Sequence, residues 1–266
     1  MMPRMSDIRQ TRLGFAPWAD PRTRRLPGTI PVAPEDWLLT DDAFGGQMAL
    51  RDDLILRAPD RVHRLDAAAR PAAVELYDRV LALLPARGHR IAGGMATRPD
   101  GVSIDLNRDA PLLTLGRLVA EDLCLMLPGP TAEHVLAGAI LCFPSGWSLH
   151  QKFMRPMMRI HEPVAAYGNQ LGRRVQRLLD GVRSDQGLMR GTAHYSAAPL
   201  HNPRTEEQGH DIDGPLPFIR VERQCLFRLP LTGAVVFSIH TSVIRPADLT
   251  PDQSAALAKF PIHRAA

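Results

Sequence analysis

Cysteine is scarce in this sequence, and its spacing excludes several kinds of site. The three cysteines, Cys124, Cys142 and Cys225, lie far apart, and no C-x-x-C pair occurs. A zinc ribbon, a ferredoxin-type cluster and a thioredoxin motif all need closely spaced thiols. The absence of C-x-x-C-H likewise excludes covalent attachment of a c-type haem. An odd number of distant cysteines makes a disulfide framework unexpected, which favours a reducing compartment.

Aromatic residues and lysines are also few, which argues against a nucleic-acid partner. Aromatics make up 5% of the 266 residues, so platforms for stacking bases are scarce. The net charge is +4, and the positive charge is almost entirely arginine, because Lys152 and Lys259 are the only lysines. The densest arginine clusters are shorter than the basic runs that track phosphates. They are Arg22, Arg24, Arg25 and Arg173, Arg174, Arg177.

Long hydrophobic runs are absent as well. No window approaches the roughly 18 uninterrupted apolar residues of a membrane span, and the best run, residues 135–143, has the length of a strand. The N-terminus has neither the apolar region nor the small-residue cleavage site of a signal peptide. We therefore expect a soluble, cytoplasmic protein that does not enter a membrane.

Several catalytic templates are missing too. There is no G-x-G-x-x-G, no P-loop and no G-x-S-x-G. No sequence motif therefore supports a nucleotide-binding fold or the nucleophile elbow of a hydrolase. His161-Glu162 is followed by Pro163, which departs from the H-E-x-x-H pattern of metalloproteases. The spacing of the histidines matches no zinc rule.

Proline and hydrophobic spacing divide the chain into an arm and a domain. Residues 1–42 hold six prolines and predict an extended arm that Trp18 and Trp37 pin to the domain surface. Residues 43–266 are predicted to form a single domain. Its helices are expected at 41–56, 67–84, 115–126 and 161–182, at 148–160 with a break at Pro156, and after a capping box at 250–253.

Strands are expected at 102–106, 134–143, 188–196, 218–229 and 234–244. Pro-Leu-Thr-Gly at 230–233 predicts that the last two strands form a hairpin. This order predicts the α+β class: an antiparallel sheet of about five strands, with a helical insert and N-terminal helices.

Three single residues carry open alternatives. Asp122 falls on the apolar stripe of the predicted 115–126 helix, so it is expected to be buried, either paired with an arginine or backbone group or orienting a functional histidine. His161 stands at a helix entrance, where a histidine that bonds to the backbone is the ordinary interpretation and a functional one stays open. His240 shares a strand face with Ser238 and Ser242, which lines either solvent or a polar pocket.

The 218–229 strand is unusually charged. Arg220, Glu222 and Gln224 alternate onto one face, and Arg223 lies on the other. The hairpin predicts that Arg223 lies across from His240 and Glu222 across from Thr241. The strand is either part of a pocket or a charged edge that resists aggregation.

Four motifs together resemble one family, the haem-dependent oxidative N-demethylase (dimethylamine mono-oxygenase) alpha-subunit-like family. They occur in the expected order between about residues 37 and 244. They are Glu121-Asp-Leu123, Ile160-His-Glu-Pro-Val164 preceded by Trp147, Arg220-Val-Glu-Arg-Gln224 with Arg228-Leu-Pro230, and Thr232-Gly-Ala-Val-Val-Phe-Ser-Ile-His240.

This resemblance implies a PAS-like fold that binds haem b. In haem PAS domains the helix before the third strand supplies the iron ligand, which implies His161 as the metal ligand. The resemblance further implies that Trp147, His194 and Tyr195 contact the haem. It also implies that the distal pocket is lined by catalytic residues, namely Arg220, Glu222, Arg223 and His240. In this pocket Glu222 would form an ion pair with a cationic amine, and an arginine would contact bound dioxygen.

The implied reaction is oxidation of an N-methyl group of a small secondary amine by O₂, with release of formaldehyde. Electrons are expected from a separate flavin and iron–sulfur reductase, since this chain has neither cluster cysteines nor a nucleotide motif. The chain departs from the family pattern at Ala165, at His194-Tyr195 and at His240. Two alternatives are a non-catalytic haem sensor or carrier of a gas or redox state, and a member without haem.

Overall fold

A large mixed sheet forms the centre of the molecule. The structure is a computed structural model that describes residues 8–24, 28–131, 133–162, 168–197, 199–208 and 214–264. Within these residues, eight strands pair in the order β1-β8-β9-β10-β6-β7-β2, with β11 beside β8. All neighbours are antiparallel except β11 and β8. The α+β class with a large, mostly antiparallel sheet is therefore confirmed, but the sheet has eight strands where about five were predicted. The PAS-like description stays a prediction.

Five of the strands are long and three are short. The long ones are β6 (Asp122–Pro128), β7 (His134–Ile140), β8 (Gly187–Ser196), β9 (Phe218–Arg228) and β10 (Val235–Ile244). The short ones are β1 (Ile30–Val32), β2 (His63–Leu65) and β11 (His263–Arg264). The predictions of β7 to β10 are confirmed to within a few residues at each end. So is the hairpin register, in which Arg223 lies opposite His240 and Glu222 opposite Thr241.

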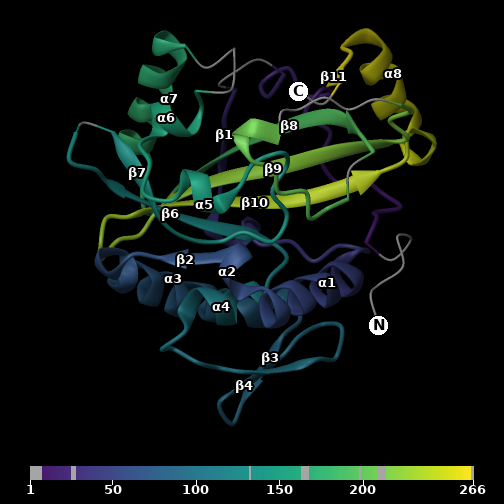
Figure 1. Cartoon of the computed structure of the whole chain (residues 1–266). Coiled ribbons are helices and arrows are strands. Elements are labelled where there is room, and N and C mark those ends of the chain that lie inside the picture. The colour runs from purple at the N-terminus through teal and green to yellow at the C-terminus, as the bar shows by residue number, and fades with distance from the viewer. Residues whose placement is uncertain are drawn as a thin grey trace.

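Helices cover both faces of the sheet, as Figure 1 shows. One face, called here the α3 face, carries α1 (Phe44–Arg57), α2 (Pro59–Val62), α3 (Arg70–Leu83) and α4 (Pro111–Gly116). The other, the α7 face, carries α5 (Leu149–Lys152), α6 (Met157–Ile160) and α7 (Asn169–Gly181). The last helix is α8 (Pro251–Lys259), which starts with the predicted capping box. Short 3-10 turns lie at Pro34–Asp36, Ala67–Ala69, Leu84–Arg87, Glu206–Gln208 and Pro246–Asp248.

Two sequence-based expectations were wrong. The predicted 115–126 helix is divided: α4 ends at Gly116, and residues 122–128 form β6. Leu123 to Leu125 are all buried, and such a continuous apolar run has no period that separates a helix from a strand covered on both faces. The predicted 102–106 strand exists as β5 (Ser103–Asp105), but it pairs with β4 (Met95–Thr97) and β3 (Arg90–Ala92) in a separate small sheet.

The described part of the proline-rich arm reaches the core. Trp37 is fully buried, its Nε1 donates to Ser238 Oγ at 2.6 Å, and its ring packs on Phe227 at 4.8 Å. Gly191 leaves room for the arm, because a Cβ at this position would overlap the Phe15 ring. Part of the arm is therefore packed into the core of the domain, and the arm does not only lie on the surface.

Candidate functional site

Polar side chains line the centre of the α7 face, where β8 and β9 pair. His194 lies opposite Arg220, and Thr192 lies opposite Glu222, as the alternation of side chains along the strands predicts. Most of this group is only half-buried, although the two strands are central in the sheet. We call this group the β8–β9 polar face. Its members are Arg190, Thr192, His194, Arg220, Glu222 and Gln224.

Arg220 fixes one end of the β8–β9 polar face. Its guanidinium is buried and donates to Phe143 O at 2.5 Å, to Leu200 O at 3.2 Å and to Glu222 Oε1 at 3.2 Å. Gln224 Nε2 donates to the other oxygen of Glu222 at 3.1 Å. The Glu222 carboxylate is therefore held in place by a neighbour on each side, and each of its oxygens keeps a further acceptor position.

A histidine and a hydroxyl lie beside this carboxylate. His194 Nε2 is 3.4 Å from Ser145 Oγ. Burial lowers the pKa of His194; the Glu222 carboxylate opposes this shift, and Arg220 reinforces it. Thr241 lies opposite Glu222 on β10, and its Oγ1 is buried and has no hydrogen-bond partner among the described residues. An unpaired buried hydroxyl is unfavourable unless it bonds to something.

His161 follows α6 and lies on the same side of the sheet. Its Nδ1 is 2.9 Å from the Met157 carbonyl oxygen, which makes Nδ1 the protonated nitrogen and leaves Nε2 on the far side of the ring. Burial lowers the pKa of His161, and the charges of Lys152 and Arg190 act in the same direction. The imidazole is therefore neutral at pH 7. The prediction that a helix begins at His161 was wrong, because His161 is the residue that ends α6 and α7 begins at Asn169. Residues 163–167, which include Ala165, lie outside the described residues.

An apolar cluster surrounds this region. Its buried members include Leu149 of α5 and Leu179 of α7, and the half-buried Trp147, Met157 and Phe237 pack against it. Lys152 is buried at the same place and its Nζ donates to the carbonyl of Ile160, so it joins α5 to α6. The sequence prediction of a broken helix over 148–160 is thereby confirmed.

Two residues of the predicted site lie on the opposite, α3 face. Arg223 donates to the carbonyls of Trp37 and Asp36, both at 2.8 Å. His240 is buried between Asp41 Oδ2 at 3.0 Å and Glu121 Oε1 at 3.2 Å. Burial lowers the pKa of His240, but these two hydrogen bonds outweigh it and raise the pKa to about 9. His240 is therefore a buried cation that ties the arm to the sheet.

The remaining predicted residue, Tyr195, packs on a third apolar cluster with Trp18 and Ile219. The structure thus brings His194, Arg220 and Glu222 together, with Trp147 and His161 on the same side of the sheet. It does not bring Arg223, His240 or Tyr195 to them. Ser145 and Thr241 were not predicted, and only the strand register could have indicated Thr241.

Asp122 pairs with an arginine and with backbone groups, as one of the two interpretations from the sequence predicted. Its carboxylate pairs with Arg51 at 2.7 Å, and both side chains are buried. It also accepts hydrogen bonds from Cys142 N at 2.6 Å and Phe143 N at 2.9 Å. Asp122 and Arg51 therefore hold the segment after β7, whose carbonyl at Phe143 in turn holds Arg220.

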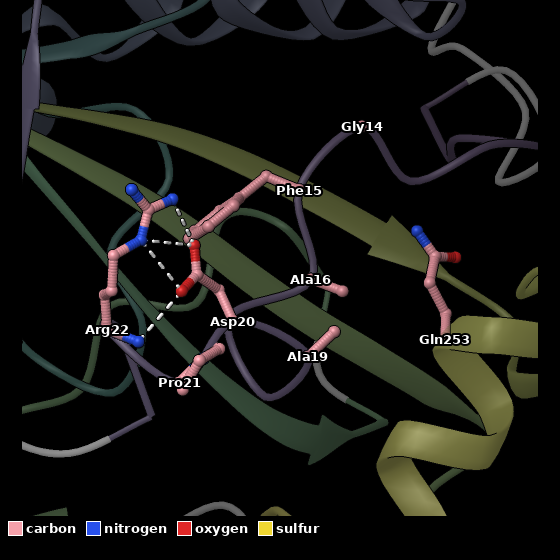
Figure 2. Close-up of a pocket in the computed structure, with 8 residues that line it drawn as sticks. All are labelled: Gly14, Phe15, Ala16, Ala19, Asp20, Pro21, Arg22 and Gln253. Atoms are coloured by element: carbon pink, nitrogen blue, oxygen red, sulfur yellow. Dashed lines mark hydrogen bonds and ion pairs between the residues drawn. The ribbon is translucent and has the colours of Figure 1, made fainter.

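A shallow cavity of about 570 Å³ that is open to solvent lies elsewhere, between the arm and α8 (Figure 2). It is lined mainly by apolar and backbone groups from Gly14 to Arg22, with Gln253 from α8. The Asp20 carboxylate and the Arg22 guanidinium bond to each other at its edge. None of the residues predicted for the site lines this cavity.

The described residues contain no group of three or more His, Cys, Asp or Glu side chains placed to hold a metal ion. A haem iron differs from such a site because the porphyrin fills four positions, so one protein ligand can suffice. Among the helices in this part of the chain, none combines the length and apolar character needed to cross a membrane.

These features define an α+β protein with a neutral histidine beside a polar sheet face. Comparison with known families assigns the chain to one of them. Residues 28–260 match the family described as haem-dependent oxidative N-demethylase, alpha subunit-like. The chain belongs to this family. The family description indicates an oxidative enzyme that depends on haem and works with other subunits. No curated protein matched the chain.

Proposed function

We propose that this protein is a haem-dependent mono-oxygenase that removes a methyl group from a small secondary amine such as dimethylamine and releases formaldehyde. Family membership supports the reaction class. The observation that carries the proposal is the neutral His161, whose Nδ1 bonds to Met157 O beside the β8–β9 polar face. The electron source is proposed to be a separate flavin and iron–sulfur reductase.

The residues on the α7 face are the ones proposed to hold haem b. His161 would ligate iron through Nε2, because a ligating histidine needs a neutral ring whose other nitrogen is fixed by a hydrogen bond. Trp147 and Phe237 supply apolar contact area, and His194 stands at the polar edge. When bound, haem supplies the reduction of O₂ and the oxidation of the methyl group.

Glu222 is proposed to bind the substrate. A secondary amine is cationic at pH 7, and the carboxylate is held by Arg220 and Gln224 with acceptor positions to spare. The Thr241 hydroxyl, which is buried opposite Glu222 and has no hydrogen-bond partner among the described residues, is proposed to orient the same ligand. Arg220 positions Glu222 and the Phe143 segment. We propose only structural roles for Arg223, His240 and Tyr195, because the contacts of these side chains lie on the other side of the sheet.

Amine-dependent formaldehyde release tests this function. Haem-loaded protein is supplied with O₂, a surrogate reductase and dimethylamine, and formaldehyde is measured against time. Glu222→Gln should lower kcat/KM about 10- to 100-fold, chiefly through KM, because it removes a charge-assisted hydrogen bond. Glu207→Gln, which changes an exposed glutamate, should have no effect.

Two outcomes would contradict the proposal. Activity unchanged in Glu222→Gln would exclude this carboxylate as the amine site. Absence of formaldehyde with any small secondary amine, from protein whose haem is present and reduced, would instead favour a gas or redox sensor.

A further inference from the structure

Three arginines form one exposed stripe along α7. Arg173, Arg174 and Arg177 are spaced as neighbours on a helix surface, and all three side chains are exposed. We call them the α7 arginine face. Within the described residues none of them forms an ion pair, whereas other exposed arginines do. Those paired arginines are Arg22 with Asp20, Arg57 with Asp53, Arg108 with Asp78, Arg183 with Asp185 and Arg245 with Asp248.

The opposite side of α7 packs against the proposed haem site. Leu179 is buried in the cluster that also contains Met157 and Ile160, the residues just before His161. Arg228 donates to the carbonyls of Leu179 and Asp180, at 2.7 and 3.0 Å, and so fixes the C-terminal end of the helix. The α7 arginine face therefore lies on the side of α7 away from the cluster that contains Ile160, the neighbour of His161, and Arg228 fixes the end of the helix. Figure 1 shows α7 beside α6.

Three like charges at this spacing repel one another and weaken the helix. An anionic partner removes this repulsion and gains from the charges. The proposed reaction also needs electrons, and the three cysteines of this chain are buried and far apart in sequence, so they cannot hold a cluster. The family description, alpha subunit-like, indicates that other subunits exist.

We propose that the α7 arginine face is the docking surface for an acidic electron-donating protein, an iron–sulfur or flavin carrier. The inference rests on the proposed function. Docking here brings the carrier close to His161, and electron transfer slows steeply with distance. In each transfer the reduced carrier loses one electron and ferric haem iron gains it, so no proton or further reactant is required.

The same face suits nucleic acid and membranes less well. Surfaces that follow a nucleic-acid strand combine many cations with aromatic platforms, and this stripe has three cations and no aromatic residue. A membrane-surface helix exposes apolar residues beside its cations, whereas Val175 and Leu179 of α7 pack inward and its three arginines are exposed.

Removing the three charges tests the docking surface. The triple variant Arg173→Gln, Arg174→Gln, Arg177→Gln keeps residues with good helix propensity. The matched control removes three exposed charges from the opposite side of the sheet, at Arg57, Arg70 and Arg90. The probes are a reduced acidic [2Fe–2S] ferredoxin, which must dock, and dithionite, which need not. Haem reduction is followed by absorbance, and ferredoxin binding by surface plasmon resonance, over a series of salt concentrations.

The triple variant should be reduced by ferredoxin at least about 10-fold more slowly at low salt, with a flatter salt dependence and weaker binding. Its reduction by dithionite should be unchanged, and the control should resemble wild type. Equal loss in both variants, no loss in either, or failure of ferredoxin to bind wild type would overturn the surface. So would a single-stranded oligonucleotide that bound wild type through these arginines more tightly than ferredoxin did.

The binding measurement needs no haem, so the two proposals can fail separately. Ferredoxin binding through this face by a protein that takes up no haem would contradict the proposed function and support the surface. A haem protein that ferredoxin reduces equally well in both forms would contradict the surface and leave the function standing.

Discussion

Replacing His240 with glutamine should destabilise the protein and remove a pH dependence that wild type shows above neutral pH. The buried ring lies 3.0 Å from Asp41 Oδ2 and 3.2 Å from Glu121 Oε1. Burial lowers its pKa, but the two carboxylates raise it from 6.5 to about 9. That difference corresponds to about 3 kcal/mol of folding free energy.

The direction of the pH effect follows from the raised pKa. The contribution of His240 is complete below pH 6.5 and is lost as the pH rises through about 9. Burial has the opposite effect on six other histidines, whose lowered pKa values destabilise the fold only below pH 6.5. They are His63, His89, His134, His161, His194 and His201. Burial raises the pKa of the Cys142 and Cys225 thiols from 9.0 to about 12, so they add a smaller loss of stability that begins near pH 9 and that His240→Gln retains.

Urea unfolding at pH 6.5 and pH 9 measures the effect. Wild type should lose about 2–3 kcal/mol of unfolding free energy between these two values. His240→Gln should already be less stable at the lower pH and change much less, while the exposed His150→Gln should follow wild type. Equal wild-type stability at both values, or a His240→Gln protein within about 0.5 kcal/mol of wild type, would refute the reasoning.

Three further substitutions test packing. Arg51→Met should destabilise by about 3–5 kcal/mol because it leaves the buried Asp122 carboxylate without its cation, and adding Asp122→Asn should recover part of the loss. Gly187→Ala should lower the unfolding free energy by about 1–3 kcal/mol, since a Cβ would overlap the Phe227 ring. Thr250→Ala should lower it by about 1 kcal/mol through loss of the capping box. Urea midpoints measure all three, and values equal to wild type would contradict the contacts described.

Local signals in the sequence predicted the local parts of the fold. The turn at 230–233 and the alternation on either side of it gave the β9–β10 hairpin with its register. Periodic apolar residues predicted α3, and Pro156 predicted the break between α5 and α6. Residues 122–128 were misassigned because Leu123 and Leu125 face one apolar cluster and Cys124 faces another, which removes the alternation of a half-exposed strand.

The candidate site was predicted in part for the same reason. Alternation already separated Arg223 from Arg220 and Glu222, and the register placed His240 with Arg223. The strand pattern therefore explains why Arg223 and His240 are absent from the β8–β9 polar face. The family resemblance, taken alone, places these two residues in one site with Arg220 and Glu222. The partners of His240 are 119 and 199 residues away in sequence. No local pattern indicates such contacts, because tertiary packing creates them.

The absorption spectrum of haem-supplied protein, compared with that of His161→Ala, tests the central claim most directly. Wild type should show a Soret band, and His161→Ala should lose it or shift it strongly, because the neutral ring held by Met157 O is the proposed iron ligand. His150→Ala, an exposed histidine on α5, should keep the wild-type spectrum. A wild-type protein without a Soret band, or a His161→Ala spectrum identical to wild type, would contradict the account.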